Sequence, residues 1–341
     1  MCNIAGYVGT KQAAPIIVEM LRKQEGWDSG YYTGIATIHE GKVYMEKCVG
    51  SLQMLLEQED VTQFPGNIGI IHGRTPGTEG KEYAHPFVGK GGDLVYVANG
   101  YGGVFADPDY KKLRETYEAL LAEGYACPTY MEGDFKMLPG GAKVHGSDLK
   151  CQEITYYVDK GMTAQEAMEK SFCERPGEIV GLLLNRKTPD RIIFARINYP
   201  MFAGIAEHGI YLATTPQAFP EDAKDIALLP QLSCGEVYRD RYTVKPFTQP
   251  PCKVASLTPA IYAKSYAAVV EALTLADMDH GQLDKLVRPF ITEGDCAQES
   301  ALDYQILYDL EKEDRLETKL SYLPGVQKGT LRPKFTASLI K

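Results

Sequence analysis

Apolar and polar positions follow two different rhythms along the first 245 residues. Short apolar runs, several of them ended by glycine, predict strands at 4–9, 34–38, 43–45, 67–72, 94–98, 179–184, 192–195, 209–213 and 236–245. Apolar residues at helical spacing predict helices at 14–23, 110–123 and 163–173. Gly124 follows the second helix, and Thr163 with Glu166 opens the third in a capping-box pattern. Strands and helices alternate without an internal repeat.

The pattern changes after a short segment that holds three prolines between Pro246 and Cys252. Helical spacing then dominates at 259–275, 280–288 and 297–311, and two strand-like runs at 316–322 and 331–339 predict a hairpin. We therefore expect two domains, 1–250 and 255–341. Three helices followed by a hairpin suggest a winged-helix-like module for the second one.

Charge limits what such a module binds. The whole chain of 341 residues has a formal net charge of −9, and residues 255–341 hold 10 Lys and Arg against 13 Asp and Glu. DNA readers need a basic surface, so we expect no nucleic-acid partner and favour protein docking or formation of a homo-oligomer. No apolar run approaches the ~20 residues of a membrane span, and no signal-peptide pattern opens the sequence. These features predict a cytoplasmic protein without a membrane partner.

Eight cysteines are scattered along the chain, and none falls in a C-x-x-C pair. This spacing argues against a disulfide framework and against a zinc site. We expect reduced thiols, no metal and no cofactor. Cys2 differs from the others by its position alone.

Cys2 lies two residues before the start of the apolar run Ile4–Gly9. If Met1 is removed, one residue carries both a thiol and a free α-amino group, which titrate near ~8.5 and ~8. The amine can then take the thiol proton, as the base does in a Cys-His pair. A strand that starts at once would hold this terminus in place, whereas most termini fray. A cysteine at position two is nevertheless ordinary in most sequences, so Cys2 alone does not decide the chemistry.

Three polar loops that follow apolar runs supply matching groups. The Asn99 side chain and the Gly100 N–H can donate to an oxyanion, although Asn-Gly is also a common tight turn. Arg74 can hold a carboxylate in bidentate fashion, or form an ordinary ion pair. His85, in Ala-His-Pro, is equally well explained as a loop histidine.

In combination and in order, these segments resemble the class II glutamine amidotransferases, and most closely the glutaminase domain of the glucosamine–fructose-6-phosphate aminotransferases. The matching motifs are M-C-N-I-A-G-Y-V-G, G-W-D-S-G, H-G-R, A-H-P and N-G, and the resemblance covers about residues 1–245. It implies a four-layer αββα sandwich of the N-terminal-nucleophile hydrolases, in the α+β class.

The resemblance also implies a mechanism. Cys2 would attack the side-chain amide of L-glutamine, with its own amine as base, and Asn99 and Gly100 would form the oxyanion hole. Arg74 would hold the α-carboxylate with His85 nearby. The family's acidic residues for the α-ammonium align with Glu132 and Asp134 when Gly124-Tyr125 is matched without gaps.

Several positions depart from the family pattern. Asn3, Glu25 and Ala98 replace a glycine, an arginine and a histidine, and Arg74-Thr75-Pro76-Gly77 lacks the tryptophan of R-W-A-T. The loop at 101–108 is about eight residues longer. Nucleophile, base and oxyanion hole are unchanged, whereas the substrate clamp and its lid are altered.

Two functions follow from this sequence. The first is a glutaminase subunit that releases ammonia for a synthase on another chain, because no second catalytic cluster is visible in 253–341. The second is a non-catalytic glutamine or amino-acid sensor that signals through its C-terminal module. The intact Cys2, Asn99 and Gly100 favour the first.

Overall fold

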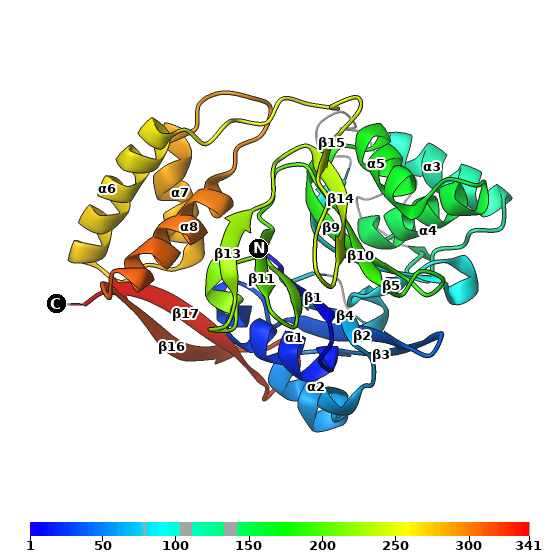
Figure 1. The fold of residues 1–341 in the computed structure, drawn as a ribbon, viewed down its shortest axis with the longest axis horizontal. Helices are drawn as coiled ribbons and strands as arrows, with labels where there is room; N and C mark the ends of the chain where they lie inside the picture. Colours follow the sequence, from blue (N-terminus) through cyan, green and yellow to red (C-terminus); the bar gives the residue numbers. More distant parts are fainter. Residues whose placement is uncertain (78–79, 103–110, 133–141, 341) are drawn as a thin grey trace.

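The structure is a computed structural model, and it describes residues 1–77, 80–102, 111–132 and 142–340. Two antiparallel sheets form its centre (Figure 1). The first has seven strands in the order β13 (Lys224–Leu228), β11 (Phe202–Ala206), β12 (Gly209–Ala213), β1 (Asn3–Gly9), β4 (Ile68–Arg74), β2 (Tyr32–His39) and β3 (Lys42–Val49). The second has six strands in the order β15 (Lys245–Pro246), β14 (Ser233–Tyr238), β10 (Arg191–Arg196), β9 (Gly177–Asn185), β6 (Leu94–Gly102) and β5 (Phe87–Val88).

Alternating side chains on β1 show how the layers stack. Ile4 and Val8 enter the apolar core between the two sheets, whereas Ala5 and Tyr7 point to the opposite face. That outer face is covered by the helices α1 (Ala13–Arg22) and α2 (Leu52–Gln58). The outer face of the second sheet is covered by α4 (Gly146–Asp159) and α5 (Ala164–Glu174), with α3 (Lys111–Ala122) against α4. The result is the predicted αββα order of layers.

The C-terminal segment contains α6 (Pro259–Leu275), α7 (His280–Val287) and α8 (Glu299–Lys312), followed by the antiparallel hairpin β16 (Leu316–Pro324) and β17 (Leu331–Leu339). The predicted three helices and hairpin are confirmed. A smaller pair, β7 (Met131–Glu132) and β8 (Ala142–Lys143), lies outside both main sheets. No helix in the described part of the chain is long and apolar enough to cross a bilayer.

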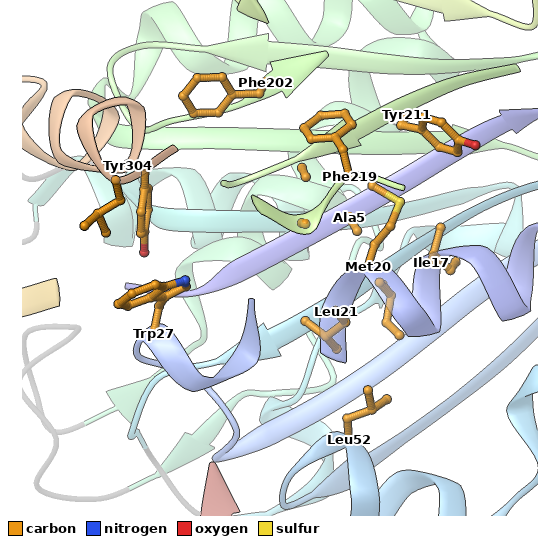
Figure 2. Close-up of a cluster of buried hydrophobic side chains, with 14 of the residues drawn as sticks. Ala5, Ile17, Met20, Leu21, Trp27, Leu52, Phe202, Tyr211, Phe219 and Tyr304 are labelled. Atoms are coloured by element: carbon orange, nitrogen blue, oxygen red, sulfur yellow. The ribbon is translucent and has the colours of Figure 1, made fainter. Parts of the chain in front are cut away.

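The C-terminal segment shares a core with the first sheet. Trp27 meets Tyr304 of α8 at a ring-centroid distance of 6.4 Å and Phe335 of β17 at 5.5 Å, both edge-on. Figure 2 shows Trp27 directly beneath Tyr304, in the same apolar cluster as Leu21 of α1. Because the neighbouring Asp28 accepts a hydrogen bond from the Met1 α-ammonium, this packing brings the C-terminal helices close to the chain terminus.

Most predicted elements are confirmed, including the capping box between Thr163 and Glu166. Gly124 has a φ of +81° just after α3, as its position predicts. The single strand predicted at 236–245 is wrong: β14 ends at Tyr238, and the chain turns so that Tyr242 bridges back to Val237. Sequence reasoning also missed α2, α4, β11 and β13.

Candidate active site

Cys2 lies where the two sheets meet. It directly precedes β1 of the first sheet, and its backbone N–H donates to Oδ1 of Asn99, on β6 of the second sheet, at 3.2 Å. Both residues are buried. The strand that begins at Asn3 is therefore what fixes Cys2 inside the fold, as the sequence predicts.

The hydrogen bond from Cys2 orients the Asn99 amide. Only the oxygen of the amide can accept this bond, so Nδ2 points the other way. Nδ2 is buried and has no hydrogen-bond partner among the described residues. A buried amide donor without an acceptor is costly unless a ligand supplies one. The arrangement matches a donor kept free for an oxyanion.

Gly100, the second predicted oxyanion-hole residue, sits next to Asn99 on β6. Its φ is +96°, and a Cβ built there would lie 1.9 Å from the carbonyl oxygen of Glu178. No other residue type fits this position without moving the backbone of β9. Glycine is therefore required by the close approach of the two strands.

His72 is the functional neighbour that sequence reasoning missed. Burial alone would raise the pKa of the Cys2 thiol, but a hydrogen bond with His72 and the charge of that imidazole outweigh burial and lower the pKa to about 6. The His72 Nε2 lies 2.9 Å from the carbonyl oxygen of Ala98, to which it can only donate. Nδ1 is then the nitrogen left for the thiol. The thiol is thus held largely as a thiolate at neutral pH.

The strand register explains why His72 reaches Cys2. Ile4 of β1 pairs with His72 of β4, and side chains two positions apart share a face of the sheet. Cys2 precedes Ile4 by two residues, so it leans toward the same face as His72. The sequence predicts both strands but not their pairing, and this pairing is what brings His72 to Cys2.

His85 lies behind His72 rather than at the thiol. Their ring centroids are 3.8 Å apart, and both ring nitrogens of His85 are buried without hydrogen-bond partners among the described residues. Burial, and then the charge of His72, lower the pKa of His85 well below its usual range. A neutral His85 can pack against His72, and its predicted place beside the substrate stays a prediction.

Arg74 ends β4, two residues beyond His72. Its Nη1 donates to the carbonyl oxygen of Tyr83 at 3.1 Å, and its guanidinium lies 4.9 Å from the ring centroid of Tyr32. Within the described ranges no carboxylate pairs with Arg74. The next residue, Thr75, places its hydroxyl 3.6 Å from the Cys2 sulfur. A cation and a hydroxyl therefore flank the thiol on one side.

Comparison with known proteins agrees with this geometry. The glutamine–fructose-6-phosphate aminotransferase (isomerizing) of Pyrococcus horikoshii is 28% identical over 253 residues, which cover 72% of this chain and 38% of the relative. The enzyme of the same name from Clostridium tetani is 32% identical over 238 residues, with 67% and 34% covered. The chain thus spans about a third of the length of these relatives. No family model matches the sequence.

Two solved structures share the fold. The glutamine phosphoribosylpyrophosphate amidotransferase of B. subtilis superposes with a TM-score of 0.58 at 13% identity, over 81% of this chain and 59% of that chain. The allosteric regulatory enzyme of purine biosynthesis gives a TM-score of 0.60 at 13% identity, over 98% and 71%. The chain belongs to the class II glutamine amidotransferases. Its α+β fold is that of their N-terminal-nucleophile domain.

The two acidic residues predicted for the amidotransferase substrate clamp are Glu132 and Asp134. Glu132 is the last residue of β7, where its backbone pairs with Ala142 of β8. Asp134 lies outside the described residues, as does most of the lengthened loop, from 103 to 108. Their predicted contact with the substrate α-ammonium is a proposal taken up below.

The start of the chain makes one further contact that bears on amidotransferase chemistry. The Met1 α-ammonium donates to Oδ2 of Asp28 at 2.8 Å. Asp28 belongs to the G-W-D-S-G segment that carries part of the family resemblance. The carboxylate therefore lies one residue from the position that a processed amino terminus would take.

Proposed function

We propose that this chain hydrolyses the side-chain amide of L-glutamine and releases ammonia, with Cys2 as nucleophile after removal of Met1. The orientation of Asn99 carries the proposal. Its oxygen holds the nitrogen that would become the α-amine, while its buried Nδ2 has no partner in the described structure. One side chain therefore positions the base and presents an oxyanion donor.

The proposed reaction starts from the Cys2 thiolate that His72 stabilises. The sulfur attacks the amide carbon, and the negative charge moves to the carbonyl oxygen, where Asn99 Nδ2 and the Gly100 N–H donate to it. The intermediate collapses to a thioester as the Cys2 α-ammonium gives a proton to the departing ammonia. Water then attacks the thioester, the amine takes its proton, and glutamate leaves with the thiolate restored.

Substrate recognition is proposed to use charge at both ends of the amino acid. Arg74 has no carboxylate partner among the described residues and lies near Cys2, which supports a role in holding the α-carboxylate. His85 backs this side of the site. Glu132 and Asp134 are proposed to face the α-ammonium, on the strength of the ungapped match from Gly124 alone.

The ammonia acceptor is proposed to be a synthase on another chain. The matched segments cover only 38% and 34% of the relatives named as aminotransferases, so nothing beyond these segments is carried over to this chain. We propose that residues 1–250 form the amidotransferase domain and that 255–341 form a winged-helix-like module for docking or self-association. Exposed Leu320, Tyr322 and Leu331 on its hairpin support a docking role. Free thiols at all eight cysteines fit a cytoplasmic protein.

The test is direct. Purified chain is incubated with glutamine, and glutamate and ammonia are measured beside Cys2→Ala and the matched control Cys173→Ala, a half-buried thiol on α5. We expect glutamate and ammonia in equal amounts, lost in Cys2→Ala and kept in the control. If glutamine binds to the unaltered chain without turnover, the sensor function replaces this proposal. If glutamine neither reacts nor binds, both are wrong.

A further inference from the structure

A second cluster of ionisable side chains lies between the helices α7 and α8. His280 and Asp284 are four residues apart on α7, so they share one face of that helix. Asp303 comes from the facing side of α8. One ligand atom from each of the three residues lies within 4.8 Å of the other two. We call these three residues the His280 cluster.

The two nitrogens of His280 have different surroundings. Nδ1 lies 2.9 Å from Oδ2 of Asp28, a hydrogen bond in which the ring must donate. The other ring nitrogen, Nε2, is buried and has no hydrogen-bond partner among the described residues. A histidine that donates one N–H to a carboxylate and leaves the other nitrogen bare is typical of metal ligands.

Asp303 faces that bare nitrogen. Its side chain is fully buried, and neither of its oxygens has a hydrogen-bond partner in the described part of the chain. Oδ2 lies 3.6 Å from His280 Nε2, too far for a good hydrogen bond. Two ligands of one tetrahedral zinc ion, each 2.0–2.2 Å from it, are about 3.3–3.6 Å apart. The spacing therefore suits a shared ion better than a direct bond.

The third ligand is already oriented by the fold. The Ser300 hydroxyl, at the start of α8, lies 2.9 Å and 3.1 Å from the two oxygens of Asp284. It can donate to only one of them at a time, so the other oxygen is left without this hydrogen bond, and one ligand atom of Asp284 lies within 4.8 Å of those of His280 and Asp303. This hydroxyl holds a carboxylate in the way that outer partners hold metal-binding carboxylates.

Two carboxylates approach one imidazole in a largely buried space. The cations near the cluster have other partners: the Met1 α-ammonium pairs with Asp28, and Lys334 Nζ pairs with Asp28 and Asp279. Among the described residues no lysine or arginine pairs with Asp284 or Asp303, so both carboxylates are available to a divalent cation.

We propose that His280, Asp284 and Asp303 bind one divalent cation of the zinc type between α7 and α8. One imidazole nitrogen with two carboxylates is a donor set that zinc accepts, and a bound water would complete four-coordination. The site uses no cysteine, which is why cysteine spacing gave no sign of it. Because Asp28 accepts from His280, the ion would also fasten the loop around Trp27 to α7.

The test uses the full chain, stripped of metal with a chelator and then titrated with Zn²⁺ in a calorimeter, with bound metal measured by mass spectrometry. We expect one ion per chain and an affinity at least about tenfold weaker in His280→Gln and in Asp303→Asn. His208→Gln is the matched control, since His208 pairs with Asp222 at 2.7 Å on the surface and belongs to no such cluster. It should bind as the unaltered chain does.

Co²⁺ substitution separates this site from the thiols. A spectrum without thiolate charge-transfer bands is expected, because the ligands are nitrogen and oxygen. If either buried substitution prevents folding, the half-exposed Asp284 provides a milder variant, Asp284→Asn, with the same expected loss. Absence of binding, or binding that all variants retain, or a thiolate spectrum, would each overturn the proposal.

Discussion

The proposed active site has two halves that are built differently. The reacting half consists of Cys2, His72, Asn99 and Gly100, which lie on or beside β1, β4 and β6 in the interior of the two sheets. The binding half consists of Arg74, Glu132 and Asp134. Arg74 ends β4, Glu132 lies in the two-residue strand β7, and Asp134 lies outside the described residues. The residues of the reacting half keep the family's motif residues, with departures only beside them at Asn3 and Ala98, whereas the segment after Arg74 departs from the family pattern itself.

This difference follows from how each half is held. A side chain on a central strand is fixed by hydrogen bonds on both sides, so its chemistry can be kept with little variation. Segments that follow strands tolerate changes in length and sequence, and they determine which ligand is accepted. The comparison therefore leads us to propose that this chain retains the catalytic residues while its substrate contacts differ from those of the family. Mutations in the two halves should affect kcat and KM differently.

The largest effect is expected from blocking the amino terminus. A chain with an uncleavable peptide before Met1 has no free amine at Cys2, so the proposed acid and base are lost. We expect kcat for glutamate release to fall about 10³–10⁴-fold relative to a chain processed to start at Cys2. Intact-mass measurement assigns the terminus of each sample. Full activity with the extension in place would show that His72 alone activates the thiol.

The next largest effect is expected from Asn99→Ala. Loss of one oxyanion donor costs about 10²–10³ in turnover, and kcat should fall by that factor with KM little changed. Asn67→Ala is a matched control, because Asn67 Nδ2 donates to the Gly9 carbonyl at the far end of β1. Steady-state kinetics on glutamine compare the variants. A change mainly in KM would place Asn99 in the binding half.

The binding half is tested by Arg74→Ala and Glu132→Gln. A hydrogen bond to a charged group contributes roughly 1.5–3 kcal/mol, so each change should lower kcat/KM about 10–150-fold. Arg74→Ala should erase discrimination between glutamine and its α-amide. Glu132→Gln should erase discrimination against the analogue that lacks the α-amino group.

Asp134→Asn is the matched variant for the acidic position. If Asp134→Asn removes the preference for the α-amino group and Glu132→Gln does not, the ungapped match from Gly124 is wrong by two residues. If neither change alters that preference, glutamine is not bound in the proposed orientation.

Amphipathic elements were predictable because one face meets the core and the other meets water. The α4 helix was missed for the opposite reason: its polar residues Asp148, Lys150 and Glu153 are buried too, so no apolar stripe is visible in its sequence. These residues are satisfied by distant partners, as when Glu153 pairs with Arg175 at 2.7 Å. Local pattern cannot reveal such pairs.

The same limit applies to the sites. Cys2, Asn99 and Gly100 could be predicted because short motifs mark them. The role of His72 could be found only from the register of β1 against β4. The His280 cluster could be found only from the packing of α7 against α8 and from the contact of Asp28 with His280. The first depends on a sheet pairing and the second on contacts across 252 residues of sequence, neither of which is encoded locally.

The smallest effect is expected from His72→Asn on thiol reactivity. In the unaltered chain, with the Cys2 pKa lowered to about 6, the thiolate is present above that pH and is lost as the pH falls through it. Alkylation of Cys2 should therefore rise with pH up to about 6–7 and then level off. Without the imidazole, burial remains and the pKa moves to higher values.

At pH 7 the His72→Asn thiol should react only about three- to tenfold more slowly, because a more basic thiolate is scarcer but intrinsically more nucleophilic. The decisive feature is the displaced inflection of the rate against pH, followed by mass spectrometry of the Cys2 peptide. Cys173 is the internal reference, since burial raises its pKa to about 11 and His72 does not contact it. An unchanged inflection at Cys2 would mean that the charge of the amino terminus, and not His72, holds the thiolate, and His72 would then belong to the packing behind the site.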